Sequence, residues 1–291
     1  MIIPTRRGDS PTLHACLSAL PSDAQVIVSI DDEHAPEPDV ARFECARVVR
    51  GPNAGPAAAR NRAIEHIDRD AVLFLNDDVV PEVSCVEHHV RAHAEGGRPS
   101  LFIGDAPWDF GRTPAVIDRL VSETPVVFFY STMGEHGPTH DWGYRHAWTL
   151  NLSLPVSLMQ RFDERLRYPM LDDIEWAYRV TRGGTPVRFL PGGRVTHLHR
   201  PLYTAQTLWQ RERLFGSQCR VLRRINPACA YDLFGNLDEP AWLHRDADGQ
   251  AAFASFERIA ERPGVGVDIE EVFDACRPWR EAARREGWHT T

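Results

Sequence analysis

The chain has 291 residues, of which 43% are apolar and 25% are charged, and its formal net charge is −8. These values are typical of a globular protein with a sizeable core, and the negative charge argues against broad, non-specific binding to nucleic acid. No run of about 20 apolar residues and no signal-peptide core is present, so no transmembrane segment is expected. Six scattered cysteines without a CxxC pair favour a reduced, cytoplasmic setting, with a peripheral membrane contact left open.

The first hundred residues alternate between strand-like and helix-like segments. Apolar and β-branched runs predict strands at 2–3, 25–30, 48–49 and 71–75. Helical spacing predicts helices at 12–20, 57–67 and 82–94. This alternation predicts a parallel sheet flanked by helices, which binds its ligands at the carboxyl ends of the strands.

Further along the chain the pattern is less regular and then becomes helical. Strands are predicted at 101–103, 126–130, 148–154, 187–190 and 195–198, and helices at 171–182, 205–225, 253–261 and 269–285. Prolines at 99 and 201 mark candidate boundaries. The sequence thus predicts a domain at 1–200, with halves at 1–99 and 100–200, and a helical extension at 201–291.

Two of the predicted strands end in pairs of carboxylates, at Asp31-Asp32 and at Asp77-Asp78. Because parallel strands end at the same edge, both pairs are expected on one rim of the sheet. The run Asn76-Asp77-Asp78 offers the oxygen ligands that Mg²⁺ and Mn²⁺ prefer. A solvated turn that caps the next helix explains this run equally well. At Asp31-Asp32 a carboxylate could accept a hydrogen bond from a base or ribose, or cap a loop.

The segment Asn53-Ala54-Gly55 leads into an alanine-rich helix that carries Arg60. Glycine allows a ligand or another backbone to approach closely, and an arginine fork suits a phosphate. An ordinary packing helix with one surface arginine is the alternative.

Two further segments carry candidate chemistry. Asp172 and Asp173 open a predicted helix, where they either interact with the helix dipole or include a general base. His197 and His199 lie two apart in a predicted strand and so share one side, where one of them could complete a metal site. The loop 135–145 with Trp142 is either an acceptor loop or a packing element.

Taken together and in this order, these segments resemble the family 2 glycosyltransferases of the GT-A fold. The matching pieces are Ile2-Ile3-Pro4-Thr5-Arg6, Val28-Ser29-Ile30-Asp31-Asp32, Asn53-Ala54-Gly55, Ala59-Arg60-Asn61, Phe74-Leu75-Asn76-Asp77-Asp78, Phe162-Asp163-Glu164, Asp172-Asp173-Ile174-Glu175, Arg179 and His197. The resemblance covers residues 1–200 and implies an α/β fold with a Rossmann-like mixed sheet. It also implies an inverting transfer of a sugar from a nucleoside-diphosphate donor, UDP-linked, to a hydroxyl acceptor with Mn²⁺ or Mg²⁺ as cofactor.

The resemblance further implies roles for individual residues. The donor would be bound by Pro4, Thr5, Arg6, Asp31 or Asp32, Asn53, Arg60 near the diphosphate, and Asp77. Asp78 would bind the metal with His197 as an additional ligand, and Asp173, or its neighbour Asp172, would be the catalytic base. Asn76 departs from the family pattern, which has an aspartate at this position.

The acceptor is not identified by the sequence and could be a saccharide, a lipid-linked molecule or a small molecule. The helical extension is expected to shape the acceptor side or to form a homodimer. Two alternatives stay open. One is a nucleotidyltransferase on a related sheet, although the opening segment contains one glycine, Gly8, where such enzymes have several. The other is a non-catalytic protein that binds nucleotide sugars.

Overall fold

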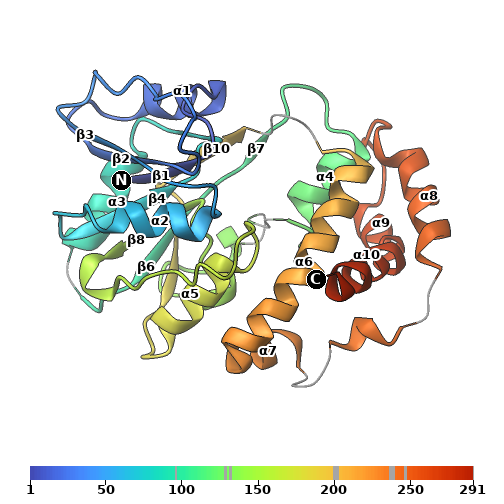
Figure 1. Cartoon of the computed structure of the whole chain (residues 1–291). Helices are drawn as coiled ribbons and strands as arrows, with labels where there is room; N and C mark the ends of the chain where they lie inside the picture. Colours follow the sequence, from blue (N-terminus) through green and yellow to red (C-terminus); the bar gives the residue numbers. More distant parts are fainter. Residues whose placement is uncertain are drawn as a thin grey trace. The chain divides into compact units, whose positions relative to one another are not determined.

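The protein is represented by a computed structural model that describes residues 1–95, 97–127, 130, 133–198, 203–235, 240–245 and 248–290. The chain divides into two compact units (Figure 1). The first unit consists of Met1–Trp108 and Met133–Leu198, and the second consists of Asp109–Thr132 and His199–Thr291. Residues 109–132 therefore group with the C-terminal part of the chain.

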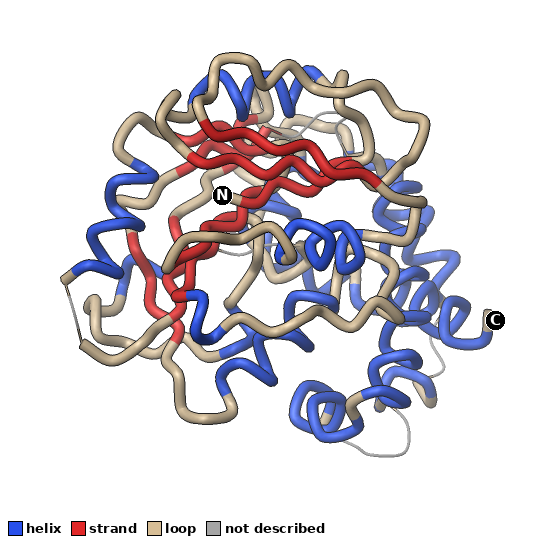
Figure 2. Tube along the Cα trace, turned by 60° about the vertical axis from the view of Figure 1, so that its left-hand side comes forward, coloured by secondary structure: helices blue, strands red, loops and turns tan. Residues whose placement is uncertain are grey.

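The first unit is built on a seven-stranded sheet of the order β3-β2-β1-β4-β8-β6-β9. Its strands are β1 (Ile2–Thr5), β2 (Gln25–Ile30), β3 (Cys45–Arg50), β4 (Ala71–Leu75), β6 (Leu101–Gly104), β8 (Asn151–Pro155) and β9 (Val187–Leu190). The four N-terminal strands run parallel to one another, whereas β8 runs antiparallel to both β4 and β6. The sheet is therefore mixed, as the family resemblance predicted, and Figure 2 shows its strands lying side by side.

Helices flank this sheet. They are α1 (Pro11–Ala19), α2 (Pro56–Ile64), α3 (Cys85–Ala94) and α5 (Asp172–Thr181). Helix α2 packs against β1, β2 and β3, and its buried alanines at 57–59 allow a close approach to the sheet. Helix α3 packs against β4, β6 and β8. The core between these elements consists of the aliphatic side chains that the sequence pattern predicted for the strands.

A second, small sheet belongs to the first unit except for Asp109, the last residue of β7. It consists of β5 (Val79–Pro81), β10 (Val195–Leu198) and β7 (Trp108–Asp109), in the order β5-β10-β7. The antiparallel pairing of β10 with β5 sets His197 opposite Val79, and the Leu198 amide donates to the Asp78 carbonyl. The small sheet thereby brings residue 197 to the end of β4, more than a hundred residues earlier in the chain.

The second unit is helical. It contains α4 (Val116–Glu123), α6 (Ala205–Ile225), α7 (Pro227–Phe234), α8 (Gly249–Ala260), α9 (Ile269–Ala275) and α10 (Arg277–His289). Helices α6 and α10 pack along each other (Figure 1), and the buried Glu212 of α6 pairs with Arg284 of α10 at 2.5 Å. Across the described part of the chain, no helix combines the length and the apolar character needed to cross a membrane.

Two of the predicted elements differ in the structure. The predicted strand at 126–130 is wrong at Val126, Val127 and Tyr130, which lie outside any strand; Phe128 and Phe129 lie outside the described residues. The Val126 carbonyl accepts a hydrogen bond from Arg211 of α6 instead of entering a ladder. The predicted helix at 269–285 is two helices, α9 and α10, which meet at Cys276.

Candidate active site

The carboxyl ends of β1, β2 and β4 surround a pocket of about 640 Å³. The Asp31 amide donates to the Thr5 carbonyl at 2.7 Å, so the ends of β1 and β2 are held together. The pocket contains most of the residues predicted to bind the donor or the metal: Pro4, Thr5, Arg6, Asp31, Asn53, Arg60, Asp77 and Asp78. The prediction that the two acidic pairs share one rim of the sheet is therefore confirmed.

Asp31 shapes the wall of this pocket from a buried position. Its carboxylate accepts hydrogen bonds from the Ala54 amide at 3.1 Å and the Gly55 amide at 2.8 Å, and it pairs with Arg62 at 2.8 Å. Three donors thus occupy Asp31, which fixes the loop that enters α2. Asp32 does not line the pocket; its Oδ1 accepts from the His34 amide in the following turn.

Gly55 occupies a place in this loop that no other residue fits well. Its φ of +102° lies in the region that favours glycine, and a Cβ there would meet the Arg167 carbonyl oxygen at 2.2 Å. The close approach of another backbone, predicted from the sequence, is confirmed. It brings the segment around Arg167 and Tyr168 to the pocket, which both residues line.

We expect Gly55→Ala to destabilise the protein by about 1–3 kcal/mol, because it adds both backbone strain and a clash with Arg167. Gly97→Ala is the matched control, since Gly97 also has a positive φ, of +115°, with nothing within 4 Å of a Cβ. Chemical denaturation of the two variants measures the difference. Equal losses of stability would show that the contact with Arg167 contributes nothing.

The acidic cluster after β4 is partly buried. Thr5 Oγ1 donates to Asp77 Oδ2 at 2.5 Å. Burial, followed by the charge of Asp78, raises the pKa of Asp77 to about 6. Two adjacent carboxylates in this setting are costly unless hydrogen bonds, a bound proton or a cation compensates their charge.

Asp78 and His197 form the part of the cluster best suited to a metal ion. His197 Nε2 lies 3.3 Å from Asp78 Oδ2, and the His197 ring stacks on Trp108 with the ring centroids 3.9 Å apart. The other carboxylate oxygen of Asp78, Oδ1, is buried and has no hydrogen-bond partner among the described residues. An unpartnered buried carboxylate oxygen beside an imidazole fits a divalent cation. No group of three or more metal-ligating side chains occurs in the described part of the chain, so substrate oxygens would have to complete the coordination. His199 lies outside the described residues.

Arg60 joins the pocket to the start of α5. It lines the pocket, and its Nη1 lies 2.7 Å from Asp172 Oδ2, in an ion pair in which both side chains are buried. Asp172 is thus engaged, and neither Asp172 nor Asp173 lines the pocket.

Among the described residues, Asp173 differs from Asp172 in forming no ion pair with an arginine; its Oδ1 accepts from the Ile174 amide. Burial and the neighbouring Asp172 raise the pKa of Asp173 to about 7, against the opposing effect of Arg60. A carboxylate with a pKa near neutrality is suited to general base catalysis.

The aromatic loop proposed as an acceptor element is hydrogen-bonded to the edge strand β9. The Trp142 amide donates to the carbonyl of Val187, at the amino end of β9, and the Trp142 ring contacts His136 and His140. Tyr144 packs edge-on against Tyr178 of α5. An acceptor role for Trp142 stays a prediction.

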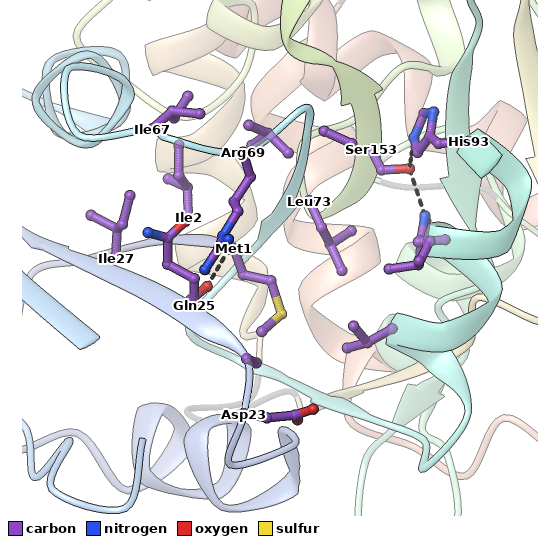
Figure 3. A pocket seen from close by; sticks show the side chains of 16 residues that line it. Met1, Ile2, Asp23, Gln25, Ile27, Ile67, Arg69, Leu73, His93 and Ser153 are labelled. Atoms are coloured by element: carbon purple, nitrogen blue, oxygen red, sulfur yellow. Dashed lines mark hydrogen bonds between the residues drawn. The ribbon is translucent and has the colours of Figure 1, made fainter. Parts of the chain in front are cut away.

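A second pocket, of about 340 Å³, lies at the amino ends of β1, β2 and β4 (Figure 3). Its floor is apolar, with Ile2, Ile27 and Leu73 from the sheet. Figure 3 also shows Ser153 hydrogen-bonded to His93 at 2.8 Å. No pair of carboxylates comparable to Asp77-Asp78 lines this pocket. The predicted donor and metal site is therefore assigned to the pocket at the carboxyl ends of the strands.

A family model, glycosyl transferase family 2, matches residues 1–148. The chain belongs to glycosyl transferase family 2 and is a glycosyltransferase. No curated protein sequence matches the chain.

Solved structures of glycosyltransferases share the fold of this family 2 chain. The mannosyltransferase PcManGT from Pyrobaculum calidifontis, solved with GDP-Man and Mn²⁺, has 13% identity and a TM-score of 0.57, over 100% of this chain and 87% of that one. S. aureus TarS has 12% identity and a TM-score of 0.51 over 99% of this chain, which spans 54% of the TarS chain. A shorter TarS, 1–349, has 10% identity and a TM-score of 0.50, over 99% of this chain and 89% of that one. The GT-A type of fold predicted from the resemblance is confirmed.

Several residues of the family 2 site were not singled out from the sequence. Arg62 pairs with Asp31, Trp108 stacks on His197, and Arg167 and Tyr168 line the pocket. The sequence offers no signal for them, because they lie in a helix face, a two-residue strand and an irregular loop.

Proposed function

We propose that the protein transfers a sugar, with inversion, from a nucleoside-diphosphate donor to a hydroxyl acceptor. The observation that carries this proposal is the pocket at the carboxyl ends of β1, β2 and β4, where Thr5, Asp31 and Arg60 lie together with Asp77 and Asp78. Membership of family 2 supports sugar transfer as the reaction.

In this proposal the donor nucleotide lies along Pro4, Thr5 and Arg6, with the diphosphate toward Asp78. Asp78 and His197 would hold Mn²⁺ or Mg²⁺ together with oxygens of the substrate. The bound ion would neutralise negative charge on the departing diphosphate. The unpartnered Oδ1 of Asp78 and the 3.3 Å approach of His197 support these two ligands.

Asp173 acts as the general base that removes the acceptor hydroxyl proton as the acceptor oxygen attacks the anomeric carbon. Asp172 is the weaker candidate, because the Arg60 guanidinium occupies its Oδ2 and it is 2% exposed, against 8% for Asp173. Attack from the face opposite the leaving diphosphate inverts the anomeric configuration.

The donor nucleotide is proposed to be UDP, and GDP is the second candidate because PcManGT was solved with GDP-Man. A thermal-shift screen of nucleotide sugars, with Mn²⁺ and with EDTA, tests this part of the proposal. We expect one donor to raise the melting temperature with Mn²⁺ and to have little effect with EDTA. Stabilisation by no nucleotide sugar, or equal stabilisation with EDTA, would contradict a metal-dependent donor site.

The transfer rate should increase with pH and level off above a pH of about 7. Asp173 has its pKa raised to about 7 by burial and by Asp172, with Arg60 opposing, so it becomes a base only as the pH passes that value. The pH dependence of kcat/KM on the acid side, measured at saturating Mn²⁺, gives the pKa of the titrating base. A profile that falls off only below pH 5 would exclude Asp173 as the titrating base.

A further inference from the structure

The buried guanidinium of Arg60 connects two parts of the site that are far apart in the sequence. Arg60 is 5% exposed and comes from α2. Its Nη1 lies 2.7 Å from Asp172 Oδ2 at the start of α5, and its Nη2 lies 3.5 Å from Asn76 Oδ1 in the acidic cluster. The guanidinium also lies over the Phe162 ring, 5.5 Å from its centroid. One side chain therefore contacts both the donor half of the site and the helix that carries Asp173.

The next residue of α2 fastens the same part of the chain. Asn61 Nδ2 donates to the Phe162 carbonyl at 2.9 Å and to Glu164 at 2.8 Å, and Asn61 Oδ1 accepts from the Phe162 amide at 2.8 Å. Asn61 and Arg60 thus attach the segment before α5 and the first turn of α5 to one turn of α2. Helix α2 therefore contributes directly to the position of the first turn of α5 beside the pocket.

The side chain at position 76 competes with Asp172 for the guanidinium of Arg60. The family pattern has an aspartate at position 76, and its charged carboxylate would be a stronger competitor than the neutral amide of Asn76. The neutral Asn76 only accepts a long contact at 3.5 Å, so the charge of Arg60 stays with Asp172 at 2.7 Å. A short, buried, charge-assisted pair holds its partners more firmly than a neutral contact does.

We propose that Arg60 is a positioning residue that holds the first turn of α5, and with it Asp173, against the donor pocket through its ion pair with Asp172. Because Asn76 is neutral, it does not draw the guanidinium of Arg60 away from Asp172. This inference rests on the proposed role of Asp173 as the base. It differs from the diphosphate contact that the family resemblance implies for Arg60, because Nη1 is already engaged by Asp172.

A double-mutant cycle tests the ion pair itself. Arg60→Met leaves the buried Asp172 without its cationic partner, with the Met170 amide still donating to its Oδ1 at 3.2 Å. This loss is strongly destabilising, and adding Asp172→Asn removes the uncompensated charge. We expect the double variant to melt at a higher temperature than Arg60→Met alone. If Arg60→Met and Asp172→Asn lower the melting temperature additively, the pair does not act as a unit and the proposal is wrong.

Arg60→Lys and Asp172→Asn are more conservative variants that nearly keep the volume of the site. They test the same ion pair by kinetics and nucleotide binding if Arg60→Met does not fold. Lysine keeps the charge but loses the planar fork that contacts Asp172 and Asn76. With the donor found by the thermal-shift screen, we expect kcat to fall by about tenfold or more in both variants, as misplacement of a reacting group predicts. The dissociation constants of UDP and GDP with Mn²⁺, measured by calorimetry, should stay within about threefold of the wild type. A like charge also leaves the neighbourhood of Asp173 in Asp172→Asn, so the acid limb of the pH profile should move to lower pH.

The proposal and its main rival give opposite results in these measurements. If Arg60 binds the diphosphate directly, Arg60→Lys weakens nucleotide binding by about tenfold or more, while Asp172→Asn leaves kcat at its pH-independent plateau unchanged. That outcome would overturn the positioning role. A failure of the proposed function appears separately, as continued turnover in Asp173→Asn, and the melting-temperature cycle is independent of turnover.

Asn76→Asp should lower kcat while nucleotide affinity is retained, because the guanidinium of Arg60 is then attracted to two carboxylates. An unchanged kcat would remove Asn76 from the proposal.

Discussion

The variant Asp173→Asn is expected to transfer sugar about a thousandfold more slowly than the wild type and to bind the donor nucleotide as tightly. Asparagine has nearly the same size and cannot accept the proton of the acceptor hydroxyl, and the loss of a general base costs about 10²- to 10⁴-fold in rate. Single-turnover kinetics with the donor at saturation measures the rate. Calorimetry of the nucleotide with Mn²⁺ measures the binding.

Asp163→Asn is the matched control for this variant. Asp163 belongs to the same half of the chain, but its carboxylate pairs with the exposed Arg165 at 2.6 Å and does not line the pocket. It should turn over at close to the wild-type rate. If Asp173→Asn kept more than about a tenth of the wild-type rate, Asp173 would not be the base.

Asp78→Ala is expected to weaken Mn²⁺-dependent nucleotide binding by at least about tenfold. Even the loss of a residue that only hydrogen-bonds to a metal ligand lowers metal affinity by about tenfold or more. The buried Oδ1 of Asp78 has no hydrogen-bond partner among the described residues, so removing the carboxylate breaks little besides the proposed ion site. Calorimetric titrations with Mn²⁺ and with EDTA separate the metal-dependent part. In EDTA the variant and the wild type should bind the nucleotide alike.

Asp39→Ala controls for the loss of one negative charge. Asp39 Oδ1 accepts from the Ala41 amide in an exposed turn, away from the residues that line the pocket. We expect it to bind the nucleotide with Mn²⁺ as the wild type does. Equal Mn²⁺ dependence in Asp78→Ala and the wild type would contradict the metal site.

The parallel part of the sheet could be predicted from the sequence because each strand is an apolar run that ends at a polar residue. The runs at 25–30 and 71–75 became β2 and β4 with those bounds. Strand β5 was missed, because three residues directly after an acidic cluster give too short a pattern. Helices α4 and α7 were missed as well, since each has only 8 residues. The predicted division at residue 200 stays a prediction about domains.

The rim of the sheet was predicted correctly because strand direction alone brings the residues after β2 and β4 together. What each residue does there depends on contacts that no spacing rule shows. Asp31 was expected to face the nucleotide, and its carboxylate instead carries three hydrogen-bond donors from the protein while still lining the pocket. The pairing of Arg60 with Asp172 joins residues 112 positions apart, so it becomes visible only when α2 and α5 are placed.

Phosphorus NMR of the products shows whether the protein transfers a sugar from a nucleoside-diphosphate donor with Asp173 as the base. The purified protein is incubated with Mn²⁺ and the donor found by the thermal-shift screen, with a panel of alcohols and saccharides as acceptors. We expect the wild type to release a nucleoside diphosphate and Asp173→Asn to release almost none. Release of pyrophosphate, which a nucleotidyltransferase would form, or equal release by both proteins would contradict the proposed function.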